Sequence, residues 1–230
     1  MDLHLVYRET RERLLRLAPT LDAAQLATMT LACPAWSVKD VFAHLSGLAG
    51  DLAAGVERPG AAAQTARQVA ERNDWAVHEI CDEWTSTGPA LERRIEAESP
   101  RLRAPVIDVW THEQDLTNAI GIPSGRRDAG LFITLNVLWS MKRKLRDAGI
   151  PSLRVVTEDV DWVIGDAEPG ATVRTTSYEA ARAVLGRRSL AQIRAFEWSG
   201  DPDLYVALMP WFEPPVTAID EPEEPEDAVD

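Results

Sequence analysis

The chain has 230 residues, of which 45% are hydrophobic, and this is enough for the core of one large domain or two small ones. Its 24 Lys and Arg residues are outnumbered by 37 Asp and Glu residues, which gives a net charge of −13. Because nucleic-acid phosphates are bound by clusters of basic side chains, this charge argues against a nucleic-acid partner. The two cysteines, Cys33 and Cys81, are too few for a disulfide framework and fit a reducing compartment.

The N-terminal residues and the hydropathy pattern indicate where in the cell the protein is expected. Charged and polar residues are mixed into the first ten positions, so this segment resembles neither a signal peptide nor a transit peptide. No apolar run approaches the roughly 20 residues that a membrane span needs. We therefore expect a soluble cytoplasmic protein with no membrane partner, either a monomer or a small homo-oligomer.

Apolar residues recur at helical spacing from the start of the chain. They predict a helix over 3–17, ended by Pro19, and a second helix over 38–54. Ser37 precedes the second helix and Asp40 follows three residues later, which predicts a capping box at its N-terminus.

Further helical patterns follow up to residue 148. The run 64–98 predicts one long helix with a short continuation, broken at Gly88 and Pro89. Two more helices are predicted over 106–120 and 128–148. Helices of this length with modest connections predict an up-and-down four-helix bundle over the first 151 residues.

The pattern changes after residue 151, where short segments rich in β-branched residues begin. We expect a bundle domain over 1–151 and a small α+β domain over 152–213. The predicted elements of the second domain are strands at 153–157, 161–164, 172–176 and 204–208, and helices at 177–185 and 189–195.

The end of the chain, 214–230, is acidic and rich in proline. Eight carboxylates and no basic residue lie between Glu213 and Asp230. The segment lacks the apolar side chains that could offset the entropy lost on ordering, so we predict a disordered acidic tail. A solvating role is favoured over binding to a partner.

Two predicted helices present side chains that could carry chemistry. His44 projects from the apolar side of the helix 38–54. Asp108 and His112 are four residues apart on the helix 106–120, and Asp115 extends the same face. Two imidazoles and one carboxylate form the three-ligand set of an open divalent-metal site. From spacing alone, a surface Asp–His ion pair and a hydrogen-bonded core histidine remain the alternatives.

Two segments resemble the motifs of one family. Residues 33–45, Cys-Pro-Ala-Trp-Ser-Val-Lys-Asp-Val-Phe-Ala-His-Leu, are similar to the first motif of the mycothiol-dependent maleylpyruvate isomerase family, a branch of the DinB-like metal-binding bundles. Residues 108–116 resemble the second motif, in which an acidic residue is followed by three others and then His. The C-terminal region is similar to the sterol-carrier-like second domain of many members. The resemblance implies a DinB-like four-helix bundle followed by a small α+β domain.

This resemblance also implies an activity. It implies a divalent ion, usually Zn²⁺, held by His44, Asp108 and His112, and a low-molecular-weight thiol as co-substrate, which is mycothiol in actinobacteria. The implied reaction is a thiol-dependent isomerisation or S-transfer on a small electrophilic metabolite. The chain departs from the family pattern in carrying Asp108 where Glu is the family residue. A hydrolase that uses a metal-bound water and a non-catalytic metal-binding or interaction protein remain the alternatives.

Three more residues are predicted to support the site. Asp115 is a candidate catalytic residue because it shares the face of Asp108 and His112. Arg187 lies in a Gly-Arg pair that resembles one in family second domains, and its guanidinium could bind the carboxylates of an anionic substrate. Trp110 is a candidate for cofactor binding, with burial in the bundle core as the alternative.

Overall fold

The structure is a computed structural model that describes residues 1–56 and 62–223. Its internal contacts divide into one unit over Met1–Gly125 and another over Arg126–Asp220. This division falls at Gly125, whereas the predicted domain boundary lies at residue 151. The difference arises because the helical run after Gly125 packs within the second unit, where α7 (Ala129–Leu135) contacts α9 (Ser177–Val184).

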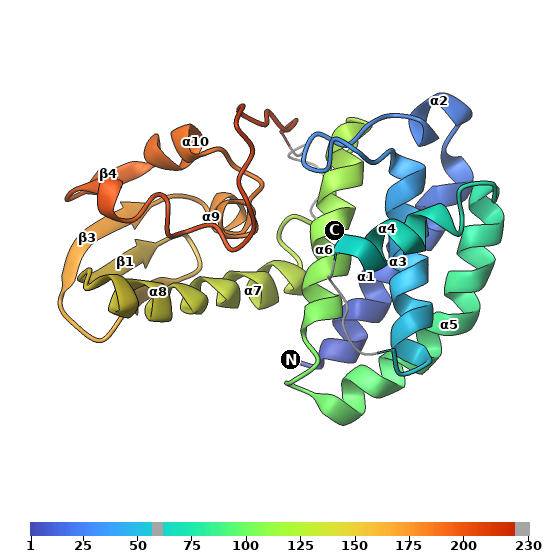
Figure 1. Ribbon diagram of the computed structural model, residues 1–230, viewed down its shortest axis with the longest axis horizontal. Helices are drawn as coiled ribbons and strands as arrows, with labels where there is room; N and C mark the ends of the chain where they lie inside the picture. Colours follow the sequence, from blue (N-terminus) through green and yellow to red (C-terminus); the bar gives the residue numbers. More distant parts are fainter. Residues whose placement is uncertain (57–61, 224–230) are drawn as a thin grey trace. The chain divides into compact units, whose positions relative to one another are not determined.

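The first unit is a four-helix bundle, as predicted (Figure 1). Helix α1 packs against α5 and α6, and α3 packs against the same two helices. Their bounds are Leu3–Leu17 for α1, Val38–Ala53 for α3, Val77–Glu98 for α5 and Ala104–Ala119 for α6. Large apolar side chains from all four are fully buried, and each contributes roughly 1.5–3 kcal/mol to folding. They include Leu14, Phe42, Trp84, Ile95 and Trp110.

The break predicted at Gly88 and Pro89 is wrong, because α5 runs through both residues. Pro89 removes one helical N–H, but burial of Trp84 and Leu91 on the same helix outweighs that loss. Gly88 is required for close packing, since a Cβ there would lie 2.7 Å from the Nε of Arg11. The interruption lies earlier, between α4 (Ala62–Ala70) and α5. Shorter elements of this unit are a 3₁₀ helix at Ala18–Thr20 and α2 at Ala23–Leu26.

The second unit contains a four-stranded sheet with the strand order β2-β1-β3-β4. Strands β1 and β3 are parallel, and the other two pairs are antiparallel. The strands span Ser152–Val156 (β1), Asp161–Ile164 (β2), Pro169–Arg174 (β3) and Glu197–Ser199 (β4). The helices are α7, α8 (Met141–Ala148), α9 and α10 (Leu190–Arg194), with a 3₁₀ segment at Asn136–Ser140 between α7 and α8.

The strand predicted at 204–208 is wrong, and the edge of the sheet is formed by β4 instead. The chain after Pro202 makes helical turns, in which the Val206 amide donates to the Pro202 carbonyl and the Met209 amide donates to the Tyr205 carbonyl. Consecutive turns bury Tyr205, Val206 and Met209 together, which an alternating strand could not do.

Part of the predicted disordered tail is ordered. Ile219 is 5% exposed, and its backbone exchanges two hydrogen bonds with the side chain of Gln192, at 2.9 and 3.1 Å. The prediction did not anticipate that this apolar residue among acidic ones is buried. The rest of the tail, 224–230, lies outside the described residues.

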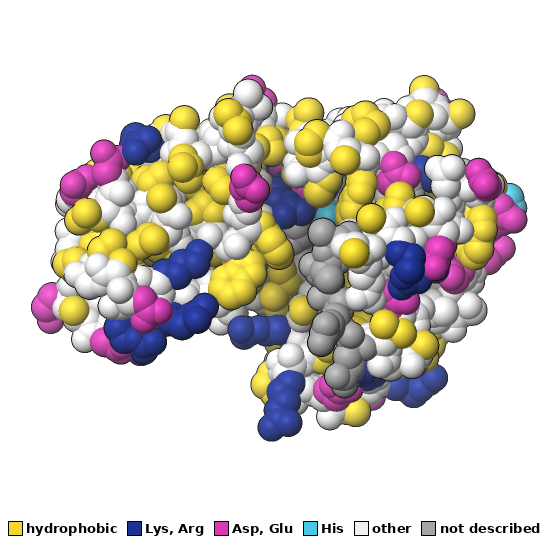
Figure 2. Space-filling view, viewed as in Figure 1, with side chains coloured by type: hydrophobic (Ala, Val, Ile, Leu, Met, Phe, Trp, Pro, Cys, Tyr) yellow, Lys and Arg dark blue, Asp and Glu magenta, His cyan; other side chains and the backbone are white. Residues whose placement is uncertain are grey.

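Charged side chains of both signs lie on the surface (Figure 2). On the face in Figure 2, Lys and Arg side chains are interspersed with Asp and Glu. Within residues 1–56 and 62–223, no helix is both long and apolar enough to cross a membrane.

Candidate metal centre

Helix α6 carries Asp108, His112 and Asp115, and its sequence explains its position. Pro105 occupies the first turn, where its missing N–H costs no helical hydrogen bond. The helix ends before Gly121, which adopts a φ of 73°. Every residue from Thr111 to Asn118 is buried, although most of them are polar. Buried polar groups need partners, so this helix is where a site is expected.

Helix α3 supplies His44. The predicted capping box is confirmed, because the Asp40 amide donates to Ser37 Oγ at 3.2 Å and the Ser37 amide donates to Asp40 Oδ2 at 2.9 Å. This cap sets the start of α3 and hence the angle at which His44 projects two turns later. The side chain of His44 is 6% exposed.

The structure brings His44, Asp108 and His112 together. Nε2 of His44 lies 3.1 Å from Asp108 Oδ2, and Nε2 of His112 lies 3.7 Å from Asp108 Oδ1. One potential ligand atom from each residue lies within 4.8 Å of the others. The two imidazole rings meet edge to face with centroids 5.1 Å apart. Both histidines are buried, while the Asp108 side chain is 34% exposed and gives the cluster an open side.

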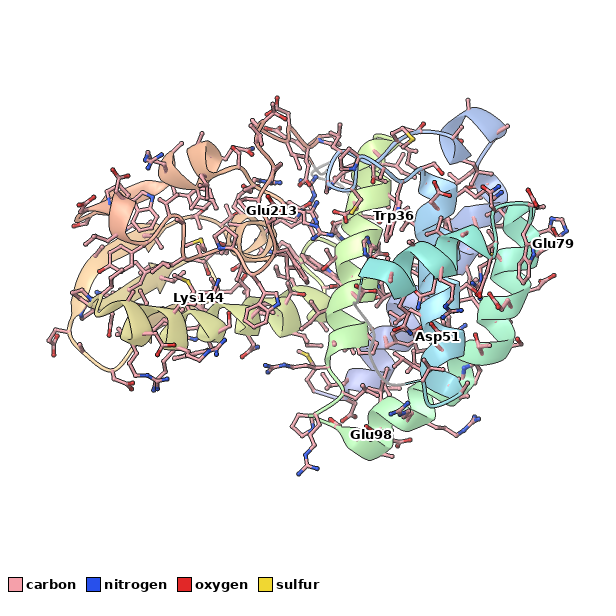
Figure 3. All side chains as sticks on the ribbon, in the orientation of Figure 1. Trp36, Asp51, Glu79, Glu98, Lys144 and Glu213 are labelled. Atoms are coloured by element: carbon pink, nitrogen blue, oxygen red, sulfur yellow. The ribbon has the colours of Figure 1, made fainter. Side chains whose placement is uncertain are left out.

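Helix α4 orients His44 through Gln68, which the sequence analysis did not identify. Nε2 of Gln68 donates to Asp51 Oδ2 at 2.6 Å, so its Oε1 faces Nδ1 of His44 at 2.9 Å as an acceptor. Asp51 is labelled on α3 in Figure 3. Burial opposes ionisation of Asp51, but hydrogen bonds from Gln64, Gln68 and Arg67 outweigh it and hold the pKa of this carboxyl below its usual value.

This orientation tests whether the residues fit a metal ion. Since Gln68 Oε1 accepts, the ring proton of neutral His44 is on Nδ1, and the lone pair of Nε2 points at a carboxylate oxygen 3.1 Å away. Two lone pairs at this distance repel unless a proton or a cation lies between them. A divalent cation satisfies both, and an imidazole held by an outer hydrogen bond is the usual form of a histidine ligand. The three residues therefore fit a cation.

The two carboxylates that follow His112 on α6 have different surroundings. Asp115 is fully buried, with Oδ2 3.1 Å from Nδ1 of His112 and 3.9 Å from Sγ of Cys33. Glu113 instead accepts two hydrogen bonds from Arg13 of α1, at 2.8 and 2.7 Å. Glu113 thus ties α6 to α1, and Asp115 is the carboxylate beside the candidate centre.

The predicted role of Trp110 in cofactor binding stays a prediction, and the structure places this residue inside the bundle. Trp110 is fully buried and its indole N–H donates to the Gly125 carbonyl at 3.1 Å, so its ring belongs to the core. The aromatic residue at the centre is Trp36, in the loop before α3 (Figure 3). Its ring centroid lies 5.0 Å from that of His44 and 5.7 Å from that of His112. The sequence signal that could have identified Trp36 is its position directly before Ser37, the N-cap of the helix that carries His44.

Arg187 lies in the second unit, just after Gly186, whose φ of 71° suits glycine. Its Nη1 donates to the Leu185 carbonyl at 2.8 Å. The neighbouring Arg188 donates from Nε and Nη2 to the two carboxylate oxygens of Glu179. A role for Arg187 in binding substrate stays a prediction.

Fold and site together define the class of this protein. It is a DinB-like four-helix bundle in which three potential metal ligands converge, followed by a small α+β domain. Residues 7–120 match the family described as the mycothiol maleylpyruvate isomerase N-terminal domain. The chain belongs to this family, which is a family of enzymes.

Solved structures share the fold over most of the chain. The crystal structure of a histidine-to-alanine mutant of the mycothiol-dependent maleylpyruvate isomerase has a TM-score of 0.55 and 14% identity, over 93% of this chain and 95% of that one. A second crystal structure of the mycothiol-dependent maleylpyruvate isomerase has a TM-score of 0.54 and 12% identity, over 81% and 88%. Among curated proteins, none matches the chain.

Proposed function

We propose that the protein is a divalent-metal-dependent and mycothiol-dependent isomerase or S-transferase that acts on a small electrophilic metabolite. The observation that carries this proposal is the convergence of His44, Asp108 and His112 within the domain that matches the isomerase family. Zn²⁺ is the favoured ion, because two imidazoles and a carboxylate with an open side are a typical donor set for catalytic zinc.

The residues of the chain have distinct tasks in this proposal. His44 and His112 would each offer one ring nitrogen from a different helix, and Asp108 would supply the carboxylate oxygen on the solvent-facing side. Gln68 keeps the Nε2 of His44 turned toward the centre. A bound divalent ion would stabilise the thiolate of a low-molecular-weight thiol, whose pKa of about 8.5 otherwise leaves it mostly protonated at neutral pH.

The thiolate is the nucleophile of the proposed reaction. Its addition to a conjugated double bond leaves a single bond that can rotate, and departure of the thiol then restores the double bond in the other geometry. If the adduct is released instead, the reaction is an S-transfer. Asp115 is proposed to accept or return a proton at this centre, and Arg187 is proposed to bind a substrate carboxylate with its planar guanidinium.

Turnover with and without thiol tests the proposal. Zinc-loaded protein is incubated with unsaturated diacids such as maleylpyruvate, with or without mycothiol, and the products are separated by chromatography. Isomerised or thiol-adducted product should form only with mycothiol, and His44→Ala should lose it. The matched control is His78→Ala, because His78 is an exposed residue of α5.

Two results would contradict the proposal. Thiol-independent formation of hydrolysed product would favour a metal-dependent hydrolase. A wild-type protein that binds neither zinc nor mycothiol would favour a non-catalytic role.

A further inference from the structure

A second group of potential ligands lies beside His112. Sγ of Cys33, a ring nitrogen of His112 and a carboxylate oxygen of Asp115 all lie within 4.8 Å of one another. The measured distances are 3.1 Å between His112 Nδ1 and Asp115 Oδ2, and 3.9 Å between Cys33 Sγ and Asp115 Oδ2. His112 faces Asp108 with its other nitrogen, Nε2. The two groups of ligands therefore meet at opposite nitrogens of one ring.

The loop that carries Cys33 is held in place by hydrogen bonds. The carbonyl of Cys33 accepts from the Trp36 amide at 2.8 Å and from Thr30 Oγ1 at 2.9 Å. The base of the loop is closed by an antiparallel bridge between Met29 and Ser37. The backbone at Cys33 is thus fixed against the start of α3, and its half-buried side chain can be reached from solvent.

The Nδ1 atom of His112 is an independent sign of a missing ligand. The His112 side chain is only 6% exposed, and Nδ1 makes no hydrogen bond among the described residues. Asp115 Oδ2 is close enough, but it lies away from the direction of a ring N–H. Leaving a buried polar atom unsatisfied destabilises the fold. A cation between Nδ1 and the carboxylate would remove this destabilisation, because two ligands of one ion approach it from different directions.

The spacing also suits a tetrahedral ion. With Zn–S near 2.3 Å and Zn–N and Zn–O near 2.1 Å, tetrahedral angles put S and O about 3.6 Å apart and N and O about 3.4 Å apart. The observed 3.9 and 3.1 Å lie within a few tenths of an ångström of these values. A thiolate, an imidazole and a carboxylate form a donor set that favours Zn²⁺ and similar ions over Mg²⁺ or Ca²⁺.

We propose that Cys33, His112 and Asp115 form a second binding site for a thiophilic divalent cation, which shares His112 with the site at His44, Asp108 and His112. On binding, the Cys33 thiol and the His112 Nδ1–H each release a proton to solvent, and the ion takes their place. When both sites are filled, His112 bridges the two ions as an imidazolate. The second ion binds more weakly, since it enters next to an existing positive charge.

This site does not depend on the proposed isomerase activity. It also distinguishes the two cysteines of the chain. Cys81 lies on α5 and belongs to neither ligand group among residues 1–56 and 62–223. Burial raises the pKa of the Cys81 thiol to about 11, so it stays protonated at neutral pH. Cys81→Ser is therefore a matched control for Cys33→Ser.

Cobalt titration of the metal-free full chain tests the proposal, with no small thiol present. Wild-type protein should bind two equivalents of Co²⁺, the weaker of which produces a near-ultraviolet thiolate-to-cobalt charge-transfer band. Cys33→Ser should lose the band and the weaker equivalent while keeping the tighter one. His44→Ala should lose the tighter equivalent and keep the band, and Cys81→Ser should behave as wild type.

Three results would overturn the proposal. Folded wild-type protein could bind one equivalent with no thiolate band, or the band could persist in Cys33→Ser. The band could also disappear in His44→Ala, which would place Cys33 on the first ion instead. Circular dichroism checks that each variant is folded, and Cys33→Ala or Asp108→Asn replaces a variant that is not. Failure of the second site alone leaves the tighter equivalent intact, so the two proposals are separable.

Discussion

Helices α6 and α9 belong to different units, and most residues of each are buried, but they bury different kinds of side chain. Helix α9 buries mainly small apolar residues, including Ala180, Ala181 and Ala183. Helix α6 buries a succession of polar residues between Thr111 and Asn118. Burial of apolar groups stabilises a fold directly, whereas burial of polar groups does so only when they are partnered.

The contrast indicates what each helix is for. The composition of α9 is explained by packing, with the exception of the fully buried Arg182, whose guanidinium lies over the ring of Tyr178. The composition of α6 is not explained by apolar packing alone, because its buried polar side chains need partners. Substitutions in the two helices distinguish these explanations.

Removal of His112 from α6 should abolish tight zinc binding. We expect His112→Ala to lower the affinity by more than about 100-fold, since a direct ligand matters more than an outer partner, whose loss costs 10–100-fold. Competition with a chromophoric chelator measures this. His78→Ala should leave the affinity unchanged. If His112→Ala and His78→Ala bind zinc equally tightly, His112 of α6 is not a zinc ligand.

Removal of Arg13 should affect stability and spare the metal. Arg13→Ala leaves the 1% exposed Glu113 without its bidentate partner, and breaking such a pair costs about 3 kcal/mol of unfolding free energy. Urea denaturation measures the loss, and zinc affinity should be unchanged. The control is Arg16→Ala on the same helix, whose exposed pair with Glu12 spans 4.0 Å and should contribute less than about 0.5 kcal/mol. A loss of zinc binding in Arg13→Ala would show that Glu113 belongs to the centre.

Loss of Gln68 should weaken the centre without destroying it. Gln68→Ala frees the His44 ring to rotate, and we expect zinc affinity to fall by about 10–100-fold. Gln64→Ala is the matched control, because Gln64 donates to Asp51 at 2.9 Å but has no bond to His44. If both variants bind zinc as tightly as wild type, the orientation of His44 does not depend on α4.

Overpacking α9 should lower the stability of the protein and leave its zinc affinity unchanged, whereas loss of a ligand from α6 should lower the zinc affinity. Ala181→Val inserts two methyl groups into a fully buried position and should cost about 1–3 kcal/mol of stability. Zinc affinity should be unaffected, because the change lies in the second unit. Thermal unfolding and chelator competition measure the two effects. A variant that keeps its stability would show that α9 is loosely packed.

The sequence predicts those features that are local. The helix periodicity, the Ser37 and Asp40 cap, and the shared face of Asp108, His112 and Asp115 follow from spacings of three and four residues. These spacings made the three residues a candidate site, and the resemblance of residues 33–45 and 108–116 to the family motifs favoured a metal site over an ion pair.

The remaining features depend on contacts between distant segments. Gln68 reaches His44 from a helix whose own pattern gives no sign of a site, and Trp36 reaches both histidines from a loop. Pro89 lies within α5 because tertiary packing overrides a local helix-breaking signal. Likewise, Ile219 is buried through its hydrogen bonds with Gln192, which lies 27 residues earlier in the chain.

The central claim is that one cation is held by His44, Asp108 and His112. The most direct test is a crystal structure of the zinc-loaded protein with anomalous data collected at the zinc absorption edge. The account predicts a peak about 2.0–2.2 Å from Nε2 of His44, Nε2 of His112 and an oxygen of Asp108. An empty position between these three side chains, in a crystal that holds zinc elsewhere, would contradict it.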